Sequence, residues 1–227
     1  MFVIAFFFRR SWVDYPEQCS IYVEHRSDFQ PMRTDAQKNY EHLLAVAREV
    51  VTEQGAHASL RDVARKAGVG LGTLYRHFPT REALLETLLR SSFDALTERA
   101  AELEASSSPE EALVSWTQRC IACAHEYRGA ISLMVAAIDD PQSALHDSCV
   151  AMKSSGARLL VRAQAEGVAR ADLASADLFA LISALAWLND QPSFAPRAEH
   201  LFDVVSSAIL PQRTGNDSRK RRTPAPR

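Results

Sequence analysis

Residues Ser59 to Phe78 read SLRDVARKAGVGLGTLYRHF, and this stretch decides the expected fold. Ser59 and Asp62 have the spacing of a helix-capping box, and Gly68 follows the short helical segment that they open. A second short helix comes next and ends before Pro79, which cannot continue it. Two short helices joined by a turn with glycines are typical of a helix-turn-helix.

The positions of the small and apolar residues in this stretch follow from how two short helices pack across a turn. Ala64 is small where the two helices cross closely, and Gly68 takes the backbone through a positive φ. Val63, Val69 and Leu74 are expected to fill the space between the helices. A triplet such as Ala64, Gly68 and Leu74 is common in helical proteins, so on its own it identifies nothing.

The longer run from Gly72 to Phe78, GTLYRHF, continues into PTREAL and is more specific. From about residue 35 to 90 it resembles the TetR family of transcriptional regulators. The departures are slight: Ser59 stands where threonine is common, Val63 where isoleucine is common, and Arg81 where lysine is usual. The following region, with the opening ALVSWTQRCIACAHEYRGA, is weakly similar to the SbtR-type branch of the family.

The resemblance implies that the helix at about 71–78 enters the major groove of DNA with its N-terminal residues nearest the bases. Leu71 would touch a thymine methyl, Thr73 would bond a base or a phosphate, and Gly72 would permit a close approach. Arg33 and Lys38 could add contacts. The residues expected at the DNA are Ser59, Arg61, Gly70, Leu71, Gly72, Thr73, Tyr75, Arg76, His77 and Arg81. For Tyr75 a role as a partly buried aromatic stays open, whereas Phe78 is assigned to the core.

Capping signals predict the helices on both sides of the motif. Thr34 to Gln37 form a capping box for a helix that Gly55 ends, and Thr80 caps a helix that runs towards Leu103. Ser108 with Pro109 starts the next helix. Later helices are expected at about 110–127, 129–138, 141–166 (opened by Asp140 and Pro141), 175–189 and 196–209.

The composition agrees with an all-α protein. The 227 residues include 35 Ala, 23 Leu and only 8 Gly, and Ala and Leu are strong helix formers. Four cysteines at irregular positions do not form the framework of a small secreted domain, so a cytoplasmic setting is expected. The longest apolar run, residues 1–8, is too short for a membrane helix. No P-loop, nucleophile elbow or HExxH motif is present, so an enzyme is not expected.

Charge and linker signals divide the chain. Formal charges are −1 for residues 1–31, +2 for 32–90, −8 for 91–210 and +5 for 211–227. We interpret these segments as a non-native or disordered extension before a start at Met32, a helix-turn-helix DNA-binding domain, a helical regulatory and dimerisation domain, and a basic disordered tail. A genuine flexible arm at 1–31 is the alternative. Ser106 to Ser108 is the best linker candidate, dividing 32–105 from 109–210.

The helical body carries two further predictions. Apolar stripes on the last two helices are expected to pair with a second copy, since the resembling family dimerises through a four-helix interface; burial of both stripes inside one chain is the alternative. Large residues on the helices of the body are expected to line an apolar ligand cavity, with ordinary core packing as the alternative. These residues are Trp116, Cys120, Tyr127, Met134, Met152 and Phe179.

The sequence therefore predicts a homodimeric, ligand-responsive transcriptional repressor that binds a palindromic double-stranded DNA operator, needs no cofactor or metal and does not act at a membrane. A small-molecule effector would release it from the operator. One alternative of another class stays open: a metal- or redox-responsive protein that uses Cys120, Cys123, His146 and Cys149, whose pairwise spacing suits a Cys3His site if two helices face each other.

Overall fold

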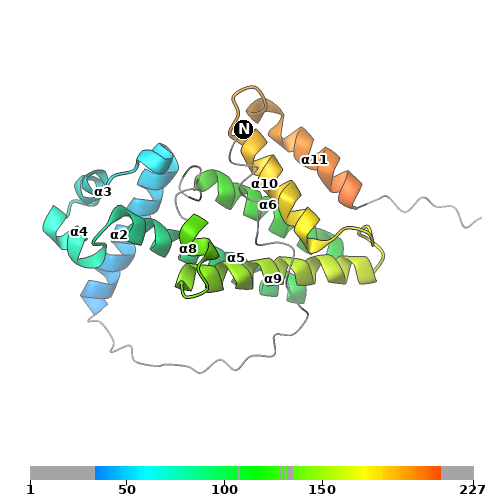
Figure 1. Cartoon of the computed structure of the whole chain (residues 1–227), viewed down its shortest axis with the longest axis horizontal. Helices are drawn as coiled ribbons and strands as arrows, with labels where there is room; N and C mark the ends of the chain where they lie inside the picture. The colour runs from blue at the N-terminus through cyan, green and yellow to red at the C-terminus, as the bar shows by residue number, and fades with distance from the viewer. Residues whose placement is uncertain (1–33, 107, 128, 130, 132–134, 211–227) are drawn as a thin grey trace, which may run out of the picture.

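The computed structural model describes residues 34–106, 108–127, 129, 131 and 135–210, and the regular elements of these residues are all helices, which confirms the all-α class. Figure 1 shows α2, α3 and α4 at one end of the molecule, and α10 beside α11 away from them. In chain order the elements are α2 (Thr34–Gln54), the 3-10 helix η1 (Gly55–His57), α3 (Leu60–Ala67), α4 (Leu71–His77), α5 (Arg81–Ser106), α6 (Pro109–Glu126), α8 (Val135–Asp139), α9 (Ala144–Ala165), α10 (Ser175–Asn189), the 3-10 helix η2 (Ala195–Arg197) and α11 (Ala198–Ile209).

The predicted end of the first helix at Gly55 and the predicted cap at Thr80 are confirmed, whereas the capping box at Thr34 to Gln37 involves side chains outside the described ones and stays a prediction. Helix α2 gives way to η1 at Gly55, whose φ of 59° lies in the left-handed region. Thr80 caps α5, because its hydroxyl oxygen accepts a hydrogen bond from the backbone N–H of Ala83 at 3.1 Å. These two caps enclose the helix-turn-helix and fix where its neighbouring helices begin and end.

Helix α5 connects the two ends of the molecule. It contacts α2 at the N-terminal end of the chain and packs along α6 and α9 over the rest of its length. The predicted domain boundary between residues 90 and 91 falls inside this continuous helix. The division of the chain into domains therefore stays a prediction, and α5 is the element through which the two parts are joined.

Ser108 opens α6 as predicted. Its hydroxyl oxygen accepts a hydrogen bond from the N–H of Glu111 at 3.2 Å, and its own N–H donates to the Glu111 carboxylate at 3.3 Å. Pro109 occupies the first turn, where its missing N–H has no cost. Two orphan donors are thus satisfied reciprocally, which explains why α6 starts here.

The prediction that Asp140 and Pro141 open a helix is wrong. The Asp140 side chain accepts a hydrogen bond from the N–H of Gln142 at 3.0 Å, which makes a turn, and α9 begins only at Ala144. Its cap is Ser143, whose hydroxyl oxygen accepts from the N–H of Leu145 at 3.2 Å. An Asp side chain can bond two residues ahead in a turn as well as cap a helix, so the dipeptide alone does not separate the two cases.

Of the helix expected at 129–138, the structure describes the part from Val135 onward, which is α8 (Val135–Asp139).

The core of the body forms where α5, α6, α9 and α10 pack together. Trp116 of α6 lies at its centre, fully buried.

None of the described helices combines the length and the apolarity that crossing a membrane requires. The predictions for residues 1–31, Met32, Arg33 and the tail 211–227 lie outside the described residues.

Candidate nucleic-acid interface

The turn between α3 and α4 depends on Gly68. This residue caps α3 with φ at 67°, a left-handed conformation that costs an L side chain roughly 1–2 kcal/mol. The next residue, Val69, donates its N–H to the Ala64 carbonyl at 3.0 Å and so closes the end of α3. Gly70 then serves as the N-cap of α4 without a side-chain bond.

Three apolar side chains fix α4 against α3. Val63 and Leu74 are completely buried, and Ala64 is 4% exposed. Val69 is half-buried and packs against the same cluster, and Phe78 belongs to that cluster as well. The prediction for the packing between the two helices is confirmed, and α4 is consequently held in one orientation relative to α3.

The outer surface of α4 carries the residues predicted to meet DNA. Leu71 is half-buried, whereas Tyr75 exposes 48% of its surface, so its role as a partly buried aromatic and its role in binding DNA both stay predictions. No acidic residue lies in the first turn of α4, and Arg76 and His77 lie in its last turn. The exposed residues of this surface are Gly70, Gly72, Thr73, Tyr75, Arg76 and His77.

His77 is oriented by an aromatic neighbour that the sequence analysis missed. Its ring lies 5.6 Å from that of Tyr40 on α2, and Tyr40 stacks in turn on Phe78 at 5.8 Å. Tyr40 of α2 thus packs against the C-terminal end of α4 through His77 and Phe78. The sequence carries one signal for this contact: Tyr40 is the only aromatic residue in the polar stretch QKNYEH of α2, which indicates that its ring packs against another element.

Two basic groups of α3 are already neutralised. Lys66 lies 2.7 Å from Glu53 and 3.3 Å from Glu49, and the hydrogen bond to Glu53 raises the pKa of Lys66. Arg65 pairs with Asp62 at 2.6 Å.

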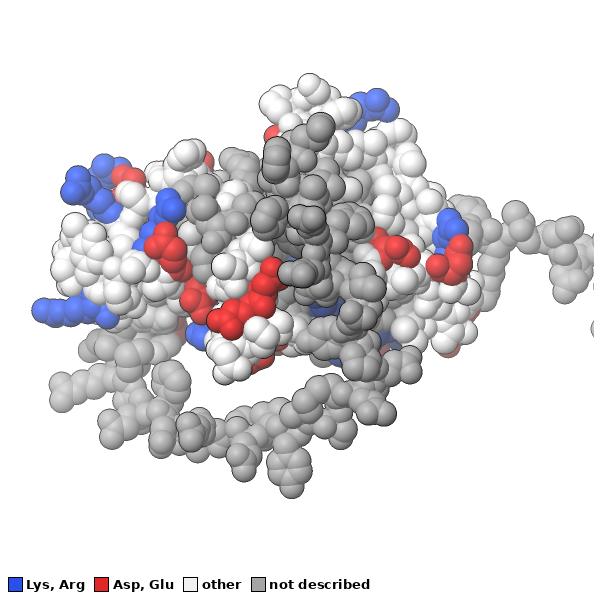
Figure 2. Space-filling view, in the orientation of Figure 1, with Lys and Arg blue, Asp and Glu red and all other residues white. Residues whose placement is uncertain are grey.

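Two other basic groups at this end of the molecule are exposed. Arg61 is exposed on α3, and Lys38 is exposed on α2. Arg81 is half-buried and lies 3.5 Å from Glu82. In Figure 2 basic groups project from the outer edge of the α3–α4 end, and acidic groups run between this end and the body.

Ser59 has less freedom to meet a phosphate than the sequence analysis assumed. Its hydroxyl oxygen accepts a hydrogen bond from the Asp62 N–H at 3.1 Å and its proton is donated to the Asp62 carboxylate at 2.6 Å. In this geometry the hydroxyl is used by the cap. A phosphate at the start of α3 would meet backbone N–H groups and the nearby Arg61 side chain instead.

The comparison with known proteins agrees with this geometry. The model of the "Bacterial regulatory proteins, tetR family" matches residues 43–88, and that of the "Transcriptional regulator SbtR-like, C-terminal domain" matches residues 108–209. The TetR transcriptional regulator SCO0520 from Streptomyces coelicolor is 36% identical, and its crystal structure aligns over 76% of this chain and 98% of its own with a TM-score of 0.60.

The chain belongs to the TetR family of transcriptional regulators. Members of this family are generally not enzymes. The weaker resemblance of the body to the SbtR-type branch is also confirmed, because that family model covers nearly the whole helical body.

Curated TetR-family relatives match over shorter stretches. UidR from Escherichia coli K12 is 37% identical over 59 residues, which cover 26% of this chain and 30% of UidR. The repressor KstR2 from Rhodococcus jostii is 34% identical over 88 residues, which cover 37% of this chain and 43% of KstR2. The chain thus matches less than half the length of these relatives.

The described residues predicted to line a ligand cavity lie in packed surroundings. The Trp116 indole N–H donates to the Leu96 carbonyl at 2.9 Å, and its ring meets Phe179 edge-on at 5.9 Å. The buried Tyr127 hydroxyl accepts a hydrogen bond from Ser92 at 3.0 Å. Phe179 also lines a small hollow of about 220 Å³. The remaining described members, Cys120 and Met152, are buried as well.

Met134 lies outside the described residues. The arrangement of the described members is what core packing produces, so a ligand cavity among them stays a prediction.

The four residues of the metal or redox alternative are not gathered into a site. Cys120 and Cys123 are buried on α6, and His146 on α9 bonds through Nδ1 to the Ile138 carbonyl at 2.7 Å. No cluster of three or more His, Cys, Asp or Glu side chains within the described part of the chain has an arrangement that could hold a metal ion. The TetR-family comparisons lend this alternative no support either.

The buried thiols are expected to resist alkylation in the native protein. Burial raises the pKa of Cys123 to about 12 and raises that of Cys120, so at pH 8 the thiolate fraction of Cys123 is about one in ten thousand. Iodoacetamide labelling followed by peptide mass spectrometry should modify both residues slowly in buffer and rapidly in denaturant. Rapid labelling of native Cys120 or Cys123 would contradict this and revive the redox alternative.

Proposed function

We propose that the protein is a transcriptional repressor that binds a palindromic operator as a homodimer and is released from it by a small-molecule effector in the cytoplasm. The exposed surface of α4, held against α3 by buried Val63 and Leu74, is the observation that carries the proposal. KstR2, one of the matched relatives, is named a repressor.

The contacts follow the geometry of helix-turn-helix proteins. The N-terminal residues of α4 would face base edges, while residues around them would reach phosphates. In this proposal the DNA-contacting residues are Ser59 (through the backbone at the start of α3), Arg61, Gly70, Leu71, Gly72, Thr73, Tyr75, Arg76, His77 and Arg81. Residues 32–90 form the DNA-binding part, and the acidic part 91–210 faces away from DNA.

The surface for the second copy is proposed on α10 and α11. Leu178 and Leu185 of α10 are buried, whereas Leu181 and Leu188 are only half-buried. On α11 the apolar residues Leu201, Phe202 and Val205 are half-buried, and Ile209 is buried. Val204 of the same helix exposes 53% of its surface. A single chain therefore covers these stripes incompletely, which suits an interface between copies. Two recognition helices must then match half-sites about 34–36 Å apart.

A gel-shift assay tests the proposal. The full chain is mixed with its own upstream region at physiological salt and with excess unrelated duplex, because Lys and Arg contacts alone bind any duplex in a salt-dependent way. We expect a shift that survives the competitor. A complex that the competitor removes completely, on this region and on fragments recovered by a genome-wide binding screen, would contradict specific recognition.

Replacement of Gly72 by alanine should separate stability from DNA binding. Gly72 is helical and exposed, and an added Cβ would meet nothing within 4 Å, so the variant should be more stable by roughly 0.5–1 kcal/mol. The same methyl group would hold α4 away from the bases and weaken operator binding roughly tenfold or more. Urea unfolding and fluorescence anisotropy measure the two effects. Unchanged operator affinity would show that Gly72 does not approach the DNA.

A further inference from the structure

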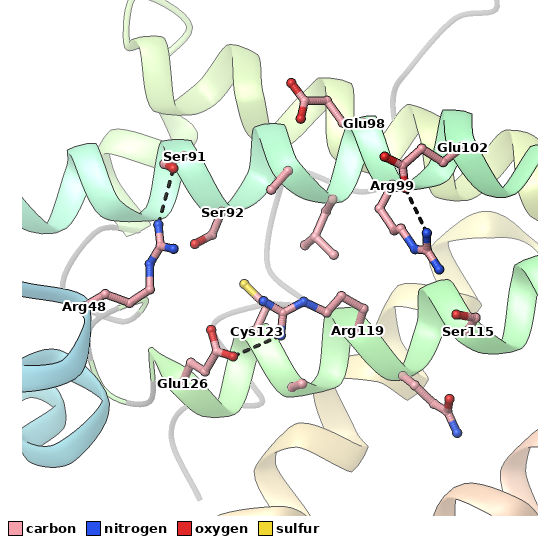
Figure 3. A pocket seen from close by; sticks show the side chains of 14 residues that line it. Arg48, Ser91, Ser92, Glu98, Arg99, Glu102, Ser115, Arg119, Cys123 and Glu126 are labelled. Atoms are coloured by element: carbon pink, nitrogen blue, oxygen red, sulfur yellow. Dashed lines mark hydrogen bonds and ion pairs between the residues drawn. The ribbon is translucent and has the colours of Figure 1, made fainter. Parts of the chain in front are cut away.

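A polar groove of about 640 Å³ lies between α2, α5 and α6. Its size is within the range of ligand sites for small molecules. Ten of its fourteen lining side chains are polar or charged, unlike the apolar cavity that the sequence analysis expected further inside the body. The groove therefore suits a polar ligand. Figure 3 shows these side chains, with Arg48 on α2, the serines on α5 and Arg119 on α6.

Two of the three arginines in the groove are neutralised by carboxylates of their own helices. Arg99 lies 2.8 Å from Glu102 on α5, and Arg119 lies 3.0 Å from Glu126 on α6 (Figure 3). Arg48 differs, because its guanidinium donates to the Ser91 hydroxyl at 3.4 Å and no carboxylate of the described residues forms an ion pair with it. Among the three arginines of the groove, Arg48 is therefore the one whose positive charge is available to bind an anionic ligand.

Hydroxyl groups surround the Arg48 end of the groove. Ser91 and Ser92 are adjacent on α5, and Ser92 donates to the buried Tyr127 hydroxyl at 3.0 Å. Burial raises the pKa of Tyr127, and the Ser92 hydrogen bond and the positive charge of Arg48 act in the opposite direction. A carboxylate or phosphate seated here would receive charge-assisted hydrogen bonds from the guanidinium and a further bond from the Ser91 hydroxyl, which accepts from Arg48 and keeps its own proton to donate.

We propose that this groove is the effector site of the regulator and that it takes a small organic anion, whose carboxylate or phosphate group is bound by Arg48 and Ser91. That the bound anion acts as the effector rests on the proposed function, whereas the binding of the anion in this groove does not. Further along α5 from the two serines, Glu98 also lines the groove (Figure 3). It is a carboxylate without an ion-pair partner among the described residues, so hydrogen-bond donors on the side of the ligand away from Arg48 fit there.

The position of the groove connects a ligand to the DNA-binding helices. Arg48 lies on α2, which packs on α3 and forms the Lys66 ion pairs with it, whereas Ser91 and Arg119 lie on α5 and α6. An anion bonded across the groove would hold α2, and with it α3 and α4, in one position relative to α5 and α6. Any change in DNA affinity that this causes must be matched by an equal change in the affinity for the ligand.

Calorimetric titration of the full chain without DNA tests the site. The probes are small mono- and dicarboxylates and phosphate monoesters, each beside its uncharged amide or alcohol. We expect saturable binding of members of the anionic set only, weakened roughly tenfold or more in Arg48→Gln. The matched control is Arg158→Gln, an exposed arginine of α9 that pairs with Glu104 outside the groove and should leave binding unchanged. Thermal unfolding checks that both variants fold.

Three results would overturn the anion site: no probe anion binds saturably, the uncharged partner binds equally well, or Arg48→Gln binds as the unchanged protein does. The effector role has a separate measurement, since a bound anion should shift operator affinity in the anisotropy assay. An anion that binds through Arg48 but leaves operator affinity unchanged would remove the effector role alone. A failed operator gel shift would count against the proposed function without touching the calorimetric result.

Discussion

Replacing Gly156 by alanine is expected to destabilise the protein by about 2–3 kcal/mol, although the same change in most helices is stabilising. Gly156 lies in α9 directly beneath the Trp116 ring, so that an added Cβ would overlap the Cη2 and Cζ3 atoms and come within 3.1 Å of the Phe179 ring. The indole has no room to move. It is fully buried, and its N–H is bonded to the Leu96 carbonyl.

Urea unfolding measures this effect. The matched control is Gly72→Ala, the helical glycine with open space around it, which should change stability in the opposite direction. A double variant with Trp116→Phe should lose less than the sum of the two single changes, because residues in contact are not additive. An alanine variant at 156 that is as stable as the unchanged protein would show that α6 and α9 do not meet through this glycine.

Replacing Tyr75 by alanine is expected to weaken operator binding about 100-fold while leaving the fold intact. Tyr75 exposes 48% of its surface, so its loss removes little core packing. A charge-assisted hydrogen bond from its hydroxyl to a phosphate contributes about 1.5 kcal/mol, and a two-fold symmetric complex loses it in both half-sites. The total of about 3 kcal/mol corresponds to roughly two orders of magnitude in Kd.

Fluorescence anisotropy with a labelled operator measures this loss. Tyr75→Phe serves as the matched control, because it removes the hydroxyl and keeps the ring. If the hydroxyl contacts a phosphate, the phenylalanine variant should lose most of the affinity that the alanine variant loses. Equal affinities for the alanine variant and the unchanged protein, with equal thermal stability, would contradict a phosphate contact at this position.

Local signals predicted the helix-turn-helix and most helix ends. The capping residues Ser59, Thr80 and Ser108 and the left-handed Gly68 act within four residues of themselves, so their consequences can be derived from the sequence. Asp140 shows the limit of this approach. Its side chain can bond into a turn or cap a helix, and the choice depends on where the chain goes next.

The body was less predictable because its important contacts join residues far apart in the chain. Trp116 depends on Leu96 and Gly156, and no periodic pattern indicates that a glycine on another helix accommodates an indole. The groove has the same character, since Arg48 and Ser91 meet from different helices and each looks like an ordinary surface residue in the sequence. Large apolar residues on helices predicted burial correctly but could not distinguish a core from a cavity.

In vitro selection from a random duplex library tests most directly whether α4 reads DNA, because it requires no knowledge of where the operator lies. The full chain is used at physiological salt, beside a Thr73→Ala, Tyr75→Ala double variant of equal thermal stability. The account predicts that the unchanged chain enriches an inverted repeat whose half-sites are about one helical turn apart and that the double variant does not. Enrichment of no sequence over the input library, or the same repeat with both proteins, would contradict it.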